Sequence, residues 1–185
     1  SDEFAPHLDE LFGTKLWRNI AENDDKDERK DELFSLYKNQ LKKNNCKYVV
    51  NFELYNMNRL KYVIFYATNH NKGCDLMKQA IWKIAPIGDF TFKAKDEAQL
   101  FIDDYDMYRD AIEKELKEHF GTQSFIDINE IINFMKSDLT IYHSLQLKTM
   151  TLKPMEKESP AKIEVKRSPG KRNFTYSDGT KIRFL

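Results

Sequence analysis

The stretch from residue 103 to the C-terminus constrains the fold of this chain more than any other feature. Its apolar spacing predicts a helix, a short strand, two further helices and a basic hairpin, in that order. We expect these elements at residues 103–120, 125–126, 127–135, 140–157, 162–167, 174–176 and 181–185. Asp127 and Thr140 are the expected caps of the second and third helices. This order of elements is typical of a winged helix-turn-helix domain.

The first half of the chain predicts a β-hairpin with flanking helices. Helices are expected at 33–43 and 75–84, and strands at 48–55 and 60–68. A two-stranded hairpin is not stable alone in water, so this one should join further strands. We therefore predict an α+β chain, in which a small α/β remnant (residues 1–95) precedes a winged helix-turn-helix domain (residues 96–185). The connector between them contains one extended piece, Phe90-Thr91-Phe92.

Charge is distributed unevenly along the chain, although the net charge is zero. Residues 1–32 hold eleven acidic and five basic residues, a balance of −6. Residues 143–185 hold ten basic and four acidic residues, a balance of +6. Such asymmetry between the ends indicates an anionic partner for the C-terminal part. Double-stranded DNA is the partner that best fits a basic winged helix.

The third helix is the element expected to lie in the major groove. At helical spacing, His143, Gln146 and Lys153 project to its outer side. Gln146 is placed to read adenine, and Lys153 to meet a phosphate. The inward side is predicted to consist of Ile141, Leu145 and Leu152.

The predicted wing supplies a second group of DNA contacts. Four cations flank its Pro-Gly turn, and a basic loop of this kind suits the phosphate backbone. They are Lys166, Arg167, Lys171 and Arg172.

An alternative remains open, because Leu147 and Met150 also fall on the predicted outer side of the third helix. An apolar outer side suits a protein-interaction module that docks a partner enzyme and binds no nucleic acid.

No reaction is indicated by the sequence. It contains no phosphate-binding loop and no Gly-x-Gly-x-x-Gly motif, and His70 has no visible catalytic partner. Cys46 and Cys74 do not have metal-ligand spacing, so we expect no metal and no cofactor.

No apolar run approaches the roughly 20 residues of a membrane span. We expect a cytoplasmic protein that self-associates through exposed strand edges.

Several short motifs resemble the C-terminal part of the bacterial three-Cys-motif partner proteins. An apolar strand ends in an Ala-Thr-x-His loop, and the next helix carries a Met-Lys…Ala-x-Trp-Lys pattern. Other similar segments are the Phe-Gly…Trp near the N-terminus and two in the C-terminal tail. These motifs lie at Ala67–His70, Met77–Lys83, Phe12–Trp17, Leu152–Glu156 and Asp178–Phe184.

This resemblance implies a methyltransferase-like α/β domain followed by a winged helix, working beside a radical-SAM-type enzyme. The early strands that would bind the methyl donor in that family have no counterpart in this chain. The chain by itself is therefore not expected to bind S-adenosylmethionine or to act as an enzyme. It begins at Ser1 rather than Met, which suggests a piece of a longer protein.

Overall fold

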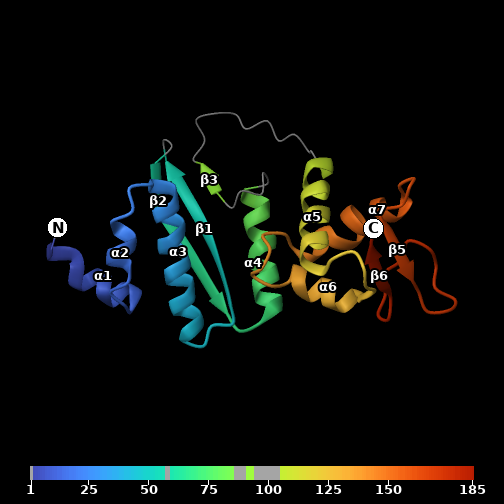
Figure 1. Ribbon diagram of the computed structural model, residues 1–185, viewed down its shortest axis with the longest axis horizontal. Helices are drawn as coiled ribbons and strands as arrows, with labels where there is room; N and C mark the ends of the chain where they lie inside the picture. The colour runs from blue at the N-terminus through green and yellow to red at the C-terminus, as the bar shows by residue number, and fades with distance from the viewer. Residues whose placement is uncertain (1, 57–58, 86–90, 94–104) are drawn as a thin grey trace.

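The computed structural model describes residues 2–56, 59–85, 91–93 and 105–185 (Figure 1). These residues form a mixed α and β structure with two small sheets. The predicted domain boundary, between residues 95 and 96, lies outside the described residues.

The chain begins with a short helical region outside the first sheet. A 3-10 turn at Asp2–Phe4 leads into α1 (Ala5–Phe12), α2 (Trp17–Ala21) and the longer α3 (Lys26–Lys43). The carboxylate of Asp25 caps α3 by accepting hydrogen bonds from the backbone N–H groups of residues 27 and 28, at 2.9 and 3.0 Å. Helix α3 therefore begins at Lys26, before the predicted start at residue 33.

The predicted hairpin is confirmed. Strands β1 (Tyr48–Asn56) and β2 (Arg59–Thr68) pair antiparallel, with Phe52 opposite Ile64. A third strand, β3 (Thr91–Lys93), runs parallel to β1 and gives the sheet order β2-β1-β3. The hairpin thus gains one short strand, and β2 remains at an edge.

Helices cover both faces of this hairpin (Figure 1). On one face, Phe34 and Tyr37 of α3 pack their rings against Phe65, with centroid distances of 5.8 and 4.7 Å. On the other face lies α4 (Asn71–Ile84). A Cβ atom at Gly73 of α4 would stand only 3.0 Å from the Thr68 hydroxyl oxygen, so the absence of a side chain allows this close approach.

The C-terminal half contains α5 (Tyr105–Phe120), α6 (Ile128–Met135), a third helical segment and a second sheet. The third helical segment is made of a 3-10 turn at Ser144–Gln146 (η2), a π-helical stretch at Leu147–Leu152 (η3) and α7 (Lys153–Lys157). The strands are β4 (Ile126–Asp127), β5 (Ile163–Lys166) and β6 (Lys181–Phe184). They pair antiparallel in the order β4-β6-β5.

Most C-terminal elements follow the sequence prediction, with two differences. Asp127 caps α6 as expected, by accepting a hydrogen bond from the Asn129 N–H at 2.8 Å. Residues 174–176 are not a strand, because Phe174 adopts a left-handed φ of 59°, which interrupts an extended chain. The third helix begins at Ser144 rather than at Thr140. The Thr140 hydroxyl oxygen instead accepts a hydrogen bond from the Tyr142 N–H in the turn before it.

A single hydrophobic core joins the two halves. Leu116, Ile131, Leu152 and Phe184 form its C-terminal part and are fully or almost fully buried. Side chains from the hairpin and α4 belong to the same cluster: Phe52, Ile81, Trp82 and Ala85. Helix α4 therefore lies between the sheet on one side and the C-terminal half on the other (Figure 1).

Candidate functional site

The contact between α4 and the C-terminal half centres on a buried lysine. Lys78 has no exposed surface, and its Nζ donates hydrogen bonds to three backbone carbonyl oxygens. These belong to Met135 at 2.7 Å, Ser137 at 2.6 Å and Thr140 at 3.1 Å. The carbonyls lie at the end of α6 and in the turn after it, where a helix leaves acceptors without internal partners. A buried cation there satisfies them and complements the negative end of the helix dipole.

Two more side chains of α4 hold the segment that leads into the third helix. The Asp75 carboxylate accepts hydrogen bonds from the Ser144 N–H at 2.8 Å and from the Ser144 hydroxyl at 2.7 Å. The Trp82 indole N–H donates to the Ile141 carbonyl at 2.8 Å. We call Asp75, Lys78 and Trp82 the α4 clasp. Asp75 therefore caps the start of η2, and its side chain occupies the N-terminal end of the third helix.

Sequence reasoning did not single out the clasp as a unit. Its one signal is spacing, because Lys78 shares a helix face with Cys74, Ile81 and Trp82, all of which are buried. A lysine at such a position is exceptional, since charged residues are rarely fully buried unless they are paired.

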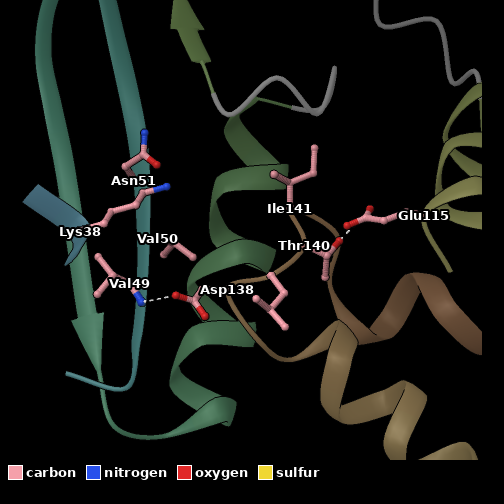
Figure 2. A pocket seen from close by; sticks show the side chains of 9 residues that line it. Lys38, Val49, Val50, Asn51, Glu115, Asp138, Thr140 and Ile141 are labelled. Atoms are coloured by element: carbon pink, nitrogen blue, oxygen red, sulfur yellow. Dashed lines mark hydrogen bonds between the residues drawn. The ribbon is translucent and has the colours of Figure 1, made fainter. Parts of the chain in front are cut away.

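An open pocket lies beside the clasp, between β1 and the loop after α6 (Figure 2). Its volume is about 170 Å³. The Asp138 carboxylate at its base accepts a hydrogen bond from the Val49 N–H at 3.0 Å and forms an ion pair with Lys42 at 2.7 Å. The Glu115 carboxyl accepts from the Thr140 hydroxyl at 3.0 Å. Both carboxyl groups therefore hold backbone segments in place.

Two ionisable side chains at the pocket have shifted pKa values. Burial raises the pKa of Glu115, although the Thr140 hydroxyl and Lys78 oppose that change. Burial lowers the pKa of Lys38. Figure 2 shows these two side chains on opposite sides of the pocket. Within the described residues, no group of three His, Cys, Asp or Glu side chains is placed to hold a metal ion.

The basic hairpin is the second candidate region. The Lys171 N–H donates to the Ser168 carbonyl across the Pro-Gly turn, and Gly170 has a left-handed φ of 81°. Lys166 and Lys181 are paired directly opposite each other in the β5–β6 register. Like charges in that arrangement repel. We call the exposed cations of this hairpin the wing cations: Lys166, Lys171, Arg172 and Lys181.

An aromatic ring lies under part of this cationic surface. The Lys166 Nζ is 3.8 Å from the centroid of the Phe125 ring, and the Arg183 guanidinium is 5.0 Å from it. Arg183 also forms an ion pair with Glu164. No salt bridge within the described residues involves any of the four wing cations.

Arg167 does not belong with the wing cations, which corrects the sequence prediction. Its side chain is only 11% exposed, and its guanidinium forms an ion pair with Glu156 of α7 at 2.5 Å. It also donates to the Thr175 carbonyl at 3.0 Å. The Tyr176 hydroxyl donates to the same Glu156 carboxylate at 2.7 Å, and burial raises the pKa of that tyrosine. Arg167 therefore ties the hairpin to α7 and is not free for a phosphate.

The third helix presents a different face from the predicted one. Gln146 is only 3% exposed, and its amide oxygen accepts a hydrogen bond from the His143 N–H at 2.9 Å. The prediction that it projects outward is wrong. Leu147 is likewise buried, whereas Ile141 and Leu145 are exposed instead of inward. The cause is local geometry, because a 3-10 turn followed by a π-helical stretch does not keep the 3.6-residue period.

The remaining predicted contacts of the third helix are half-buried. Burial lowers the pKa of His143, which lies beside Trp82 with a ring-centroid distance of 6.2 Å. Lys153 begins α7 and keeps part of its side chain in solvent. The structure brings Lys166, Lys171 and Arg172 together on one hairpin, and it removes Gln146 and Arg167 from the candidate surface.

Comparisons with protein-family models, with curated proteins and with solved structures find no match to this chain. No helix among the described residues is both long enough and apolar enough to cross a membrane.

We predict that replacing Lys78 with Met destabilises the protein. Three buried carbonyl oxygens lose their donor, and unsatisfied buried groups cost about 1–3 kcal/mol each, so the total loss should be about 3 kcal/mol or more. Urea unfolding measures it. Lys83→Met, on an exposed part of the same helix, is the matched control and should change stability by less than about 0.5 kcal/mol. Equal effects of the two substitutions would refute the role of the clasp.

The same pair of proteins should differ in pH dependence. Burial lowers the pKa of Lys78 from 10.5 to about 8. The unfolded chain therefore binds this proton more tightly than the folded chain between those values, and raising the pH through this range favours folding. The Lys78→Met variant has no titrating group at this position, so its stability does not gain this contribution as the pH rises. We expect the stability advantage of wild type over the variant to grow from pH 8 towards pH 10 in urea unfolding. A pH-independent difference would show that Lys78 does not titrate in this range.

Proposed function

We propose that residues 105–185 form a winged-helix domain that binds double-stranded DNA, mainly through phosphate contacts of the wing cations. The observation that carries this proposal is the group of exposed cations on the β5–β6 hairpin, for which the described part of the chain provides no carboxylate in an ion pair. Lys166 and Lys181 are opposite each other on neighbouring strands. An anion bound beside them would relieve their repulsion, and the DNA backbone offers a row of such anions.

The order and pairing of the elements support the winged-helix assignment. A helix, a short strand, two helical segments and a two-stranded hairpin follow one another, with β6 between β4 and β5. In such domains, the third helix and the hairpin loop contact the duplex. Here the hairpin is the more suitable element, because Asp75 occupies the start of the third helix and Gln146 is buried. Lys153 adds one further partly exposed cation.

Binding of this kind would be strong at low salt and would depend little on sequence. Phosphate contacts release condensed counterions, whereas specificity requires polar side chains at base edges. In the third helix, the exposed positions include Leu145, Lys148 and Thr149. Leu145 offers no hydrogen bond to a base edge. We therefore propose a backbone-binding protein with weak base readout, acting in the cytoplasm.

One observation favours the alternative, a protein-docking function. Leu139, Ile141 and Leu145 are exposed within seven residues of chain, just before and at the start of the third helix. Exposed apolar side chains that gather in one place mark protein contacts more often than nucleic-acid contacts. By its resemblance to the three-Cys-motif partner proteins, the occupant would be a radical-SAM-type enzyme.

Family membership is part of the same proposal, and it has support in the placement of the motifs. The Ala-Thr-x-His segment lies where β2 ends and α4 begins. The lysine of the Met-Lys pair is Lys78, and the tryptophan of the same pattern is Trp82. Both are members of the α4 clasp, which gives these motif positions a structural role.

DNA binding can be tested by fluorescence anisotropy with a random-sequence duplex at about 50 and 200 mM salt. Affinity should fall steeply between these concentrations. The triple variant Lys166→Ala, Lys171→Ala and Arg172→Ala should lower affinity, and it should reduce the slope of log K against log salt by about 0.9 for each lost contact. No binding at the lower salt concentration would reject the DNA proposal in favour of protein docking.

A charge-matched control separates local contacts from general electrostatics. The variant Lys26→Ala, Lys43→Ala and Lys83→Ala removes the same number of exposed cations from α3 and α4. We expect it to bind with nearly the wild-type salt slope. If both triple variants lose affinity equally, the cations act only through net charge, and the wing assignment is wrong.

A further inference from the structure

Strand β2 has an open edge. Strand β1 pairs with it on one side, and no described strand lies on the other. Every second residue of an edge strand directs its backbone N–H and C=O groups to the open side, where they can pair with another strand. β2 spans ten residues, from Arg59 to Thr68. This edge is much longer than the three-residue strand at the opposite edge of the sheet.

The composition of β2 leaves most of this edge unprotected. Residues 62–68 contain no charged residue, no proline and no glycine. Tyr62 is 71% exposed and Ile64 is 47% exposed, and both lie on the face that α4 covers further along the strand. Natural edge strands avoid association with charges, prolines or bulges. Arg59, Lys61 and the register shift opposite Leu54 and Tyr55 provide such protection only at the beginning of β2.

We propose that β2 pairs antiparallel with the β2 strand of a second copy of this chain, centred on Ile64. The two three-stranded sheets would then join into one six-stranded sheet. The proposal is independent of DNA binding, because β2 belongs to the other half of the chain.

The positions of the charged residues favour a second copy of the chain as the partner and an antiparallel direction of pairing. In an antiparallel pair centred on Ile64, Lys61 lies opposite Ala67 and Arg59 lies opposite Asn69. The two cationic ends are then at opposite ends of the paired region. A parallel pair would place Arg59 and Lys61 beside the same residues of the other copy, where like charges repel. With a net charge of zero, the whole chains also have no long-range repulsion to overcome.

Symmetry brings the exposed apolar side chains together. A two-fold axis perpendicular to the sheet keeps corresponding faces on the same side. Tyr62 and Ile64 of both copies would therefore form one apolar strip, with the exposed Leu76 of each α4 on the same face. This strip would bury side chains that are left in solvent in the single chain.

Light scattering of the full chain over a concentration series tests association. The expected mass is about 44 kDa, twice the 22.0 kDa of one chain. The double variant Tyr62→Lys and Ile64→Lys adds two cations at exposed positions and should be a monomer. Leu139→Lys with Leu145→Lys adds the same charge at exposed sites away from β2 and should remain a dimer. A wild-type monomer at all concentrations, or loss of the dimer in both variants, would overturn the proposal.

Disulfide cross-linking tests the direction and the register. In a Cys46→Ser background, Ile64→Cys would face its own copy and form a cross-linked dimer on non-reducing gels. Leu60→Cys would face Thr68 and should remain uncross-linked. Cross-linking through both positions would indicate parallel pairing, and cross-linking through neither would indicate another surface. Either result would overturn the proposed pairing.

Discussion

The structure depends above all on the buried ammonium group of Lys78. Burying a charge is costly unless hydrogen bonds replace the lost water. Here three carbonyl oxygens replace it, and all of them come from the end of α6 and the turn that follows. The same ammonium thus ends one helix, shapes a turn and attaches α4 to the C-terminal half. Asp75 and Trp82 extend this attachment to the start of the third helix.

Where apolar periodicity is long and regular, the fold could be predicted from the sequence. The β1–β2 hairpin, α4, α5 and α6 lie close to their expected positions because each buries a regular apolar face. The third helix was harder, since its first turns are 3-10 and π-helical. A fixed 3.6-residue period assigns residues to the wrong side in such a segment. Leu145 and Gln146 were exchanged between surface and interior for that reason.

The candidate surface could be predicted only in part, because composition reveals charge but not partners. Lys166, Lys171 and Arg172 are exposed as expected from a basic loop. Arg167, next to Lys166 in sequence, instead pairs with Glu156, eleven residues earlier. Lys78 is the converse case, a cation that looks like one more charge on an amphipathic helix. Its partners are backbone carbonyl oxygens, which every residue type has, so the sequence does not reveal them.

The α4 clasp also bears on how the chain reaches this structure. The contacts from Lys78 to the turn after α6 join residues 57 to 62 positions apart, and those from Asp75 span 69. Closing a loop of that length costs conformational entropy, and the contacts that offset this cost form only after the loop has closed. Until α4 docks, the carbonyls of Met135, Ser137 and Thr140 must stay solvated, and the third helix lacks its cap. We therefore expect the turn after α6 and the start of the third helix to reach their final form only when α4 docks, since local contacts alone do not satisfy these groups.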